Sequence, residues 1–219
     1  MIKNYPSKEY YKNLDFYKDM HQNGYHLIDG RKRQAKNAYD GKSTLAYAPI
    51  IKNIIKYENI QNMIDYGSGK GKFYTNGFNL GNKFIPPLRK FWDIDIKLYD
   101  PCYAKYSKFD KDKTFDLLIC IDVLEHIPEN DIDWILKRFL SISNKFIFLN
   151  VACYDAIALL PDGRNAHINV QKPIWWSNKI EKLIKARTDV KLICVCTVKD
   201  NGKPKHIPLE YNCKIKDYT

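Results

Sequence analysis

Three glycines at alternate positions lie in the segment DYGSGKG, residues 65–71. Glycine loses more backbone freedom on folding than any other residue, so this spacing disfavours both a helix and a strand interior. It is typical of a turn whose backbone is closely approached by another group. We therefore expect Gly67, Gly69 and Gly71 to form a ligand-binding turn, with the carboxylate of Asp65 beside it.

The spacing of these glycines separates three kinds of ligand-binding turn. A dinucleotide site requires G-x-G-x-x-G, and a P-loop requires G-x-x-x-x-G-K-[ST]. Residues 67–71 read G-x-G-x-G, and Phe73 stands where a P-loop has serine or threonine. A second candidate, GKS at residues 41–43, fails because Lys36 stands where its first glycine belongs. Neither motif accounts for the turn.

What the segment resembles is the acidic-x-G-x-G-x-G motif of the class I S-adenosylmethionine-dependent methyltransferases. The resemblance extends over residues 60–215: Asp100 ends the apolar segment DIKLYD, and FDLLICIDVLEHI is similar to the fourth-strand signature of that family. It implies an α/β fold, in which a three-layer Rossmann-like sheet is mostly parallel and ends in an antiparallel strand pair. It also implies S-adenosylmethionine as the cofactor.

The same resemblance implies where the cofactor binds. The glycines leave backbone N–H groups open to its carboxylate, Asp65 attracts its ammonium group, and Asp100 accepts hydrogen bonds from both ribose hydroxyls. The expected cofactor residues are Asp65, Gly67, Ser68, Gly69, Gly71, Asp100, Pro101, Asp122 and Val123. Simpler roles remain open, because Gly67 can serve a tight turn and Asp100 can serve a turn before Pro101.

Catalytic candidates come from loops that follow the predicted strands. Methyl transfer from a sulfonium depends on positioning and desolvation, and the family has no universal catalytic residue. His167 can take a proton from an attacking hydroxyl or amine, His126 follows the fourth-strand segment, and Arg164 can clamp an anionic group. Each histidine has a structural alternative, a hydrogen bond within its own loop or a place at a helix start. We predict no metal site, because ligands at zinc-type spacing are absent.

Apolar patterns indicate the elements that position these residues. Helical spacing predicts helices over residues 43–57, 131–140 and 175–186. Continuous apolar runs predict buried parallel strands near residues 60–66, 95–100, 115–123 and 145–151, followed by an antiparallel pair near 190–198 and 206–215. The two tryptophans at 175–176 are expected to pack their helix onto the sheet.

Two segments depart from the pattern of the family. Only 14 residues separate Asp100 from Phe115, too few for the usual helix and third strand, so that strand is expected to be tiny or displaced. Asp110 or Asp112 is the candidate for the adenine amino group, although FDKDK is equally a solvated charged turn. The long span from Gly71 to residue 93 is expected to form an irregular excursion near the cofactor.

Length and composition indicate one domain over residues 1–219, with residues 1–58 as an N-terminal helical clasp packed on the core. The six cysteines are scattered without a CxxC pair, as in a reduced protein. No apolar run is long enough to span a bilayer and no secretory signal is evident, so we expect a cytoplasmic protein without membrane contact.

The formal charge of +11 invites a nucleic-acid interpretation. The lysines are dispersed, however, as on a solvated surface, and no DPPY-type segment follows the fourth strand. We therefore expect methyl transfer to a small-molecule or nucleotide-like acceptor. An RNA or DNA methyltransferase, or a non-catalytic cofactor- or nucleic-acid-binding protein of the same fold, is the alternative.

Overall fold

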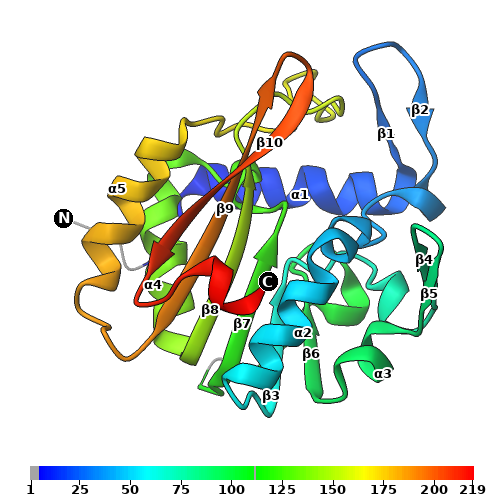
Figure 1. Cartoon of the computed structure of the whole chain (residues 1–219). Helices are drawn as coiled ribbons and strands as arrows, with labels where there is room; N and C mark the ends of the chain where they lie inside the picture. The colour runs from blue at the N-terminus through cyan, green and yellow to red at the C-terminus, as the bar shows by residue number, and fades with distance from the viewer. Residues whose placement is uncertain (1–4, 111) are drawn as a thin grey trace.

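A six-stranded sheet runs through the centre of the molecule (Figure 1). The computed structural model describes residues 5–110 and 112–219. The strands are, in spatial order, β10 (Lys203–Tyr211), β9 (Lys191–Asp200), β8 (Ser143–Ala152), β7 (Phe115–Ile121), β3 (Asn62–Tyr66) and β6 (Asp95–Tyr99). Only β10 is antiparallel to its neighbour; the other four pairings are parallel. The predicted mostly parallel sheet with a closing antiparallel pair is confirmed.

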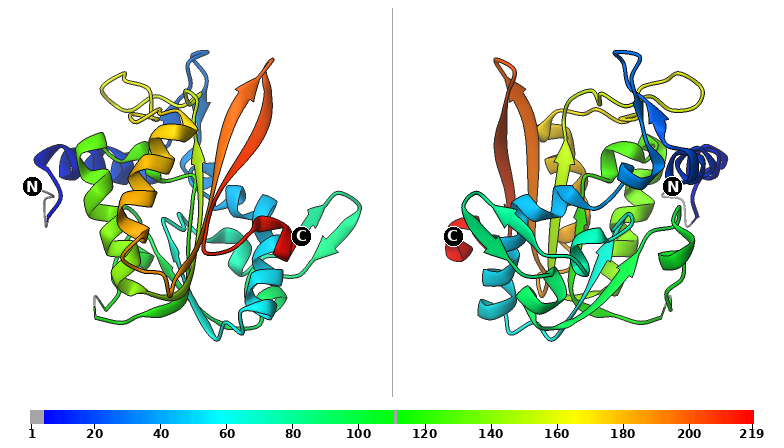
Figure 2. Two further views of the ribbon diagram at one scale, coloured as in Figure 1. Left: turned by 60° about the vertical axis from the view of Figure 1, so that its left-hand side comes forward. Right: turned by 90° about the vertical axis from the view of Figure 1, so that its right-hand side faces the viewer.

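Helices cover both faces of the sheet, which gives three layers (Figure 2). One face carries α4 (Ile132–Ile142) and α5 (Pro173–Ile184), and the other carries α2 (Ala48–Tyr57) and the short α3 (Leu88–Trp92). All seven residues of β7 are buried, because both faces of this central strand are covered. This burial explains why six of the seven are apolar; the exception, Asp116, accepts from the backbone N–H of Gln61 and pairs with Lys145.

The N-terminal part is more regular than the sequence predicts. It begins with α1 (Lys8–Asn23), a 16-residue helix capped by the Ser7 side chain, which accepts from the backbone N–H of Tyr10. A small hairpin follows, and then two 3₁₀ turns lead into α2. Their bounds are β1 (Tyr25–His26), β2 (Lys32–Arg33), η1 (Ala35–Asn37) and η2 (Lys42–Tyr47). The helix predicted from residue 43 therefore starts as a 3₁₀ turn and becomes α-helical at Ala48.

The two segments that depart from the family pattern take defined structures. Residues 72–92 form η3 (Lys72–Tyr74), the hairpin β4 (Phe78–Leu80) and β5 (Lys83–Ile85), and α3. Between β6 and β7 the described residues hold only the turn η4 (Ala104–Tyr106), so β6 is an edge of the sheet. The remaining 3₁₀ turns are η5 (Leu124–His126), η6 (Glu129–Asp131) and η7 (Ile215–Tyr218).

The cysteines take part in packing. All six are free thiols, and Cys120, Cys194 and Cys196 are fully buried in the core between the sheet and α4 and α5. Among the described helices, none combines the length and apolar character that crossing a membrane requires.

Candidate functional site

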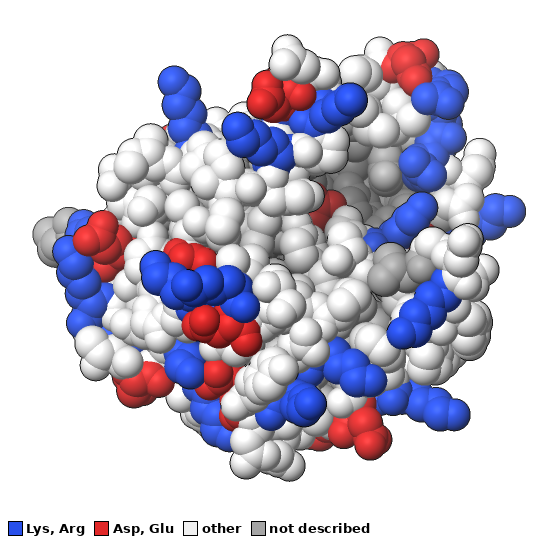
Figure 3. Space-filling model, in the orientation of Figure 1, with Lys and Arg blue, Asp and Glu red and all other residues white. Residues whose placement is uncertain are grey.

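A cleft of about 600 Å³ opens at the carboxyl ends of β3, β6 and β7. In Figure 3 the molecule is hollowed between the β1–β2 and β9–β10 hairpins. The cleft is lined by the glycine turn, by α1, by residues 33–44 and by residues 154–158. Its size suits a cofactor together with a small acceptor.

The glycine turn is held in a conformation that other residues rarely adopt. Gly67, Gly69 and Gly71 have φ of +92°, +57° and +57°. A Cβ atom on Gly67 would lie 2.4 Å from a methyl group of Val123, and one on Gly69 would lie 2.3 Å from the carbonyl oxygen of Tyr39. The groups that closely approach the glycine backbone therefore include parts of the protein itself, the Val123 side chain and the Tyr39 carbonyl, in addition to any ligand in the cleft.

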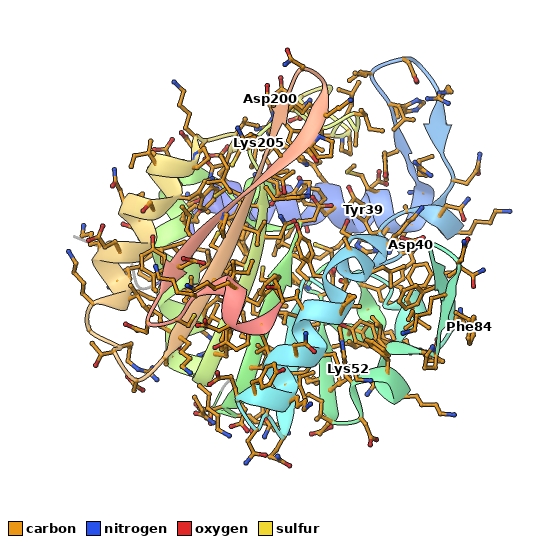
Figure 4. The ribbon with its side chains drawn as sticks, viewed as in Figure 1. Tyr39, Asp40, Lys52, Phe84, Asp200 and Lys205 are labelled. Atoms are coloured by element: carbon orange, nitrogen blue, oxygen red, sulfur yellow. The ribbon has the colours of Figure 1, made fainter. Side chains whose placement is uncertain are left out.

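Lys70 joins this turn to the N-terminal segment, residues 8–44. Its ammonium group donates to the carbonyl oxygens of His21 and Ala35, the former at 3.1 Å. Its backbone N–H donates to Tyr39 at 2.7 Å, and that of Lys72 donates to Asp40 at 3.1 Å. Tyr39 and Asp40 are labelled in Figure 4, between the β1–β2 hairpin and α2. The N-terminal segment thus forms one wall of the cleft.

Asp100 lies in the cleft at the end of β6, as the resemblance implies. Its Oδ2 accepts from the backbone N–H of Gly69 at 2.9 Å, and Oδ1 accepts from that of Cys102 at 2.8 Å. Each carboxylate oxygen keeps a lone pair for a ligand hydroxyl. Burial raises the pKa of Asp100. His21, which the sequence did not single out, places Nε2 3.9 Å from Oδ1 and stacks on Tyr39.

Asp65 does not line the cleft, contrary to the role implied by the resemblance. Its neighbour Tyr66 does, and successive side chains of a strand point to opposite faces. Asp65 is buried on the other side, where the Tyr74 hydroxyl donates to its Oδ2 at 2.6 Å. Burial raises its pKa to about 7 despite that hydrogen bond, with a further contribution from Asp100. A direct contact with a cofactor ammonium is not available to it in this structure.

The other expected cofactor residues divide into two groups. Pro101, Asp122 and Val123 line the cleft with Gly67, Gly69 and Asp100, whereas Ser68 and Gly71 do not line it and are joined within the turn by a backbone hydrogen bond of 3.1 Å. Asp110 and Asp112 are exposed and lie outside the cleft. The aspartates thus fit the charged-turn interpretation better than a contact with adenine.

Both candidate histidines lie in the cleft. The Nδ1 of His167 is 2.6 Å from the carbonyl oxygen of Tyr154. Because a carbonyl only accepts, Nδ1 carries the proton and Nε2 presents a lone pair. The Nδ1 of His126 likewise lies 2.9 Å from the carbonyl of Ala166 and 2.9 Å from the Tyr17 hydroxyl. Burial, together with His167, lowers the pKa of His126 to about 4.

Two carboxylates stand beside His167. Ligand atoms of Asp122, Glu125 and His167 all lie within 4.8 Å of one another. The Ser43 hydroxyl donates to Asp122 Oδ2 at 2.8 Å, and the backbone N–H of Ala152 donates to Glu125 Oε1 at 2.7 Å. Nothing in the sequence shows that Glu125 is fully buried. The D-x-x-E spacing at residues 122–125 could have indicated only that the two carboxylates lie close together on one short turn.

Arg164 lies outside the cleft. Its Nε donates to Asp162 at 2.9 Å, Nη2 donates to Asn13 Oδ1 at 3.2 Å, and Nη1 is 3.7 Å from Glu9. The guanidinium therefore links the loop at residues 160–172 to α1, and this position does not suit the expected clamp on an anionic substrate. Asn165 shapes the same loop by accepting from the backbone N–H of His167 at 2.9 Å.

The tryptophans pack as expected. Trp176 is fully buried against the sheet, and Trp175 meets it edge-to-face at 4.8 Å between ring centroids. Neither lines the cleft.

A family model for the methyltransferase domain matches residues 20–177 of the chain. The match covers the N-terminal segment from the end of α1, the glycine turn, Asp100 and the loop that carries His167. The chain belongs to this methyltransferase family. No match was found among curated proteins or among solved structures.

Proposed function

We propose that this methyltransferase binds S-adenosylmethionine at the glycine turn and Asp100, and methylates a small acceptor that carries an anionic group. The observation that supports this most is the single cleft in which Gly67, Gly69 and Asp100 face His167 and Asp122. Methyl transfer requires cofactor and acceptor to be held side by side and shielded from water, which such a cleft provides.

The size of the acceptor follows from what covers the cleft. Residues of α1, from Tyr10 to His21, and of the segment 33–44 form a wall over it. A cleft of about 600 Å³ is of the size that takes a small molecule or a single nucleotide. A duplex nucleic acid is too wide for it and could present only a flipped-out nucleotide.

The charge of the acceptor follows from the cations at the rim. Arg33, Lys42 and Lys199 line the cleft, and Figure 3 shows Lys and Arg side chains on both sides of the hollow. Four aspartates line it as well: Asp40, Asp100, Asp122 and Asp155. Guanidinium and ammonium groups bind phosphate and carboxylate well, so the proposed acceptor is one whose anionic group contacts the three cations.

His167 is placed to assist the acceptor. When a hydroxyl or amine attacks the sulfonium methyl, the new bond forms to the methyl carbon and the C–S electron pair leaves with sulfur. The acceptor then loses a proton, and the Nε2 lone pair of His167 lies in the cleft to receive it.

Cofactor binding is tested by calorimetry. Asp100→Ala removes the acceptor for the backbone N–H groups of Gly69 and Cys102, and the expected partner for the ribose, so affinity should fall at least about tenfold. Asp110→Asn is the matched control and should bind as the unaltered chain does. Equal affinity in Asp100→Ala would contradict the cofactor site.

The acceptor class is tested by release of S-adenosylhomocysteine from pools of phosphate- or carboxylate-bearing small molecules, RNA and duplex DNA. With an anionic small acceptor, Arg33→Gln and Lys199→Gln should raise KM about tenfold and leave kcat nearly unchanged. Lys52→Gln, on α2 away from the cleft (Figure 4), is the control. Turnover on RNA or DNA alone, with steep salt dependence, would establish the alternative.

A further inference from the structure

Glu125 has a buried carboxylate oxygen that the fold leaves unused. The residue is 0 % exposed, and Oε1 accepts from the backbone N–H of Ala152. Oε2 has no hydrogen-bond partner among the described residues. Leaving a buried polar atom unpaired is costly, so an atom of this kind points to a missing ligand or proton.

The surroundings of that oxygen are those of a cation site. Asp122 brings a second carboxylate and His167 an imidazole, all with ligand atoms within 4.8 Å of one another. We infer that Asp122, Glu125 and His167 bind a hard divalent cation, Mn²⁺ or Mg²⁺, at the acceptor end of the cleft.

His167 is oriented as a metal-bound histidine would be. Its Nδ1–H donates to the carbonyl oxygen of Tyr154 at 2.6 Å, which leaves the Nε2 lone pair as the ligand atom. Metal-ligating histidines characteristically donate their other N–H to a carbonyl or carboxylate, which fixes the tautomer and the ring. Asp122 is also held in place, since Ser43 donates to its Oδ2 at 2.8 Å and its backbone has φ of +60°.

The ligand types decide which cation is favoured. Two carboxylates and one imidazole without a thiolate suit Mn²⁺ or Mg²⁺ better than a soft metal. Such an ion at about 2.1 Å from each ligand needs ligand atoms about 3–4 Å apart, which small side-chain rotations achieve. Asp122 and His167 line the cleft and Glu125 lies behind them, so the remaining positions of the ion would face the acceptor.

The role of the ion rests on the proposed methyl transfer, whereas its binding does not. An acceptor hydroxyl on the ion would have a lowered pKa, as metal-bound water does. Its oxygen then forms the C–O bond, the C–S electron pair leaves with sulfur, and the hydroxyl proton goes to solvent water. In this form of the reaction His167 is a ligand and not the base.

The binding test uses the full chain and Mn²⁺ alone, without cofactor or acceptor. Loss of the free Mn²⁺ electron paramagnetic resonance signal should show one ion bound per chain, displaced by excess Mg²⁺. Asp122→Asn, Glu125→Gln and His167→Ala should each weaken binding by at least about tenfold, the lower end of what second-shell changes cost. Glu129→Gln alters an exposed carboxylate one turn further on and should bind as the unaltered chain does.

Glu125→Gln is the most informative variant, because it preserves shape and the hydrogen bond from Ala152. It removes a buried charge, so the variant should fold at least as stably while losing the ion. If Glu125→Gln does not fold, Asp122→Asn takes its place in the binding test. No bound Mn²⁺ up to about 1 mM, the weak end of protein cation sites, would overturn the inference and favour a proton shared between the two carboxyls. Equal binding in the three variants would overturn it as well.

The metal inference and the proposed function fail separately. Calorimetry with S-adenosylmethionine, repeated after treatment with a chelator, reports on the cofactor site alone. Cofactor binding without Mn²⁺ binding would contradict the metal inference and leave the proposed methyltransferase function supported. Once an acceptor is known, turnover that is unchanged by the chelator would remove the catalytic role of the ion and leave His167 as base.

Discussion

The two ends of the cleft are built in different ways. At the end that we propose binds the cofactor, called the cofactor end, one contiguous turn supplies Gly67 and Gly69, and Asp100 fixes it by accepting a backbone hydrogen bond. At the end that we propose binds the acceptor, called the acceptor end, the polar groups come from segments far apart in the chain: Ser43, Asp122, Tyr154 and His167. The first depends on backbone conformation, and the second depends on the assembly of the whole fold.

This difference predicts which measured property a substitution at each end should change. A change at the cofactor end alters the backbone and with it the docking of the N-terminal segment, so binding and stability should fall together. A change at the acceptor end removes one side chain from a frame that persists, so turnover should fall while cofactor binding stays. Substitutions at both ends can test this contrast, and the largest expected effect is at the cofactor end.

Gly69→Ala should be the most damaging small substitution. Its Cβ would lie 2.3 Å from the Tyr39 carbonyl oxygen, and its φ is +57°. We expect the free energy of unfolding to fall by about 1–2 kcal/mol from backbone strain and about 1–3 kcal/mol more from the forced separation. Cofactor binding should be lost in calorimetry.

Gly202→Ala is the matched control for that substitution. Gly202 also has a positive φ, +77°, but a Cβ atom added there would have no other atom within 4 Å. It should show the strain alone, about 1–2 kcal/mol in urea unfolding, with normal cofactor binding. Equal losses in the two variants would mean that the contact with Tyr39 is unimportant.

His167→Ala should separate turnover from binding. Its ring lies beside Tyr154 and His126, and none of its hydrogen bonds or ring contacts in the described part of the chain involves the glycine turn, so cofactor affinity should stay within about threefold, or 0.7 kcal/mol. Turnover should fall by about 10²–10⁴, the usual cost of a lost proton acceptor. His26→Ala, an exposed histidine on β1, is the control. A loss of cofactor affinity as large as the loss of turnover would remove the contrast between the two ends.

Asp65 should make stability depend on pH. Its pKa of about 7 in the folded chain exceeds that of an unfolded aspartate, about 3.9. Between these values the folded chain binds more protons, so the free energy of unfolding should decrease as pH rises from about 4 to about 7 and level off above. From pH 5 to 7 the expected loss is on the order of 2 kcal/mol.

Urea unfolding of the unaltered chain and of Asp65→Asn at several pH values measures this loss. The variant should lack the Asp65 part of the slope, while Tyr74, Asp100 and Cys120, the titratable groups that interact with Asp65, remain in both chains. Saturating cofactor should not change the difference, because Asp65 lies outside the cleft. If the cofactor abolished it, Asp65 would be the ammonium partner that the resemblance implies.

The same contrast explains what could be predicted from the sequence. Six of the seven buried residues of β7 are apolar, all but Asp116, and the conformational freedom of Gly67 and Gly69 is a property of the residue type, so sheet and turn were predictable. The side of β3 to which Asp65 points was not, because a motif fixes spacing and leaves open which face meets the ligand. The burial of Glu125 and the contact of Tyr39 with Gly69 were also not predictable, since segments distant in sequence create them.

Arg164→Ala should have the smallest effect, and it tests the boundary of the acceptor end. The Arg164 side chain is 42 % exposed and its partners are Asp162, Asn13 and Glu9, none of which contacts the glycine turn or His167 by a hydrogen bond. Exposed ion pairs contribute up to about 1 kcal/mol, so urea unfolding should show a loss of that size or less. Turnover should stay within about threefold, as in Arg31→Ala, whose exposed pair with Asp29 serves as control. A hundredfold loss of turnover in Arg164→Ala alone would support a role for Arg164 in binding an anionic group, and would place the outer part of the loop in the acceptor end. If turnover is preserved, the acceptor end extends no further than His167, because Arg164 stabilises the loop against α1 without reaching the cleft.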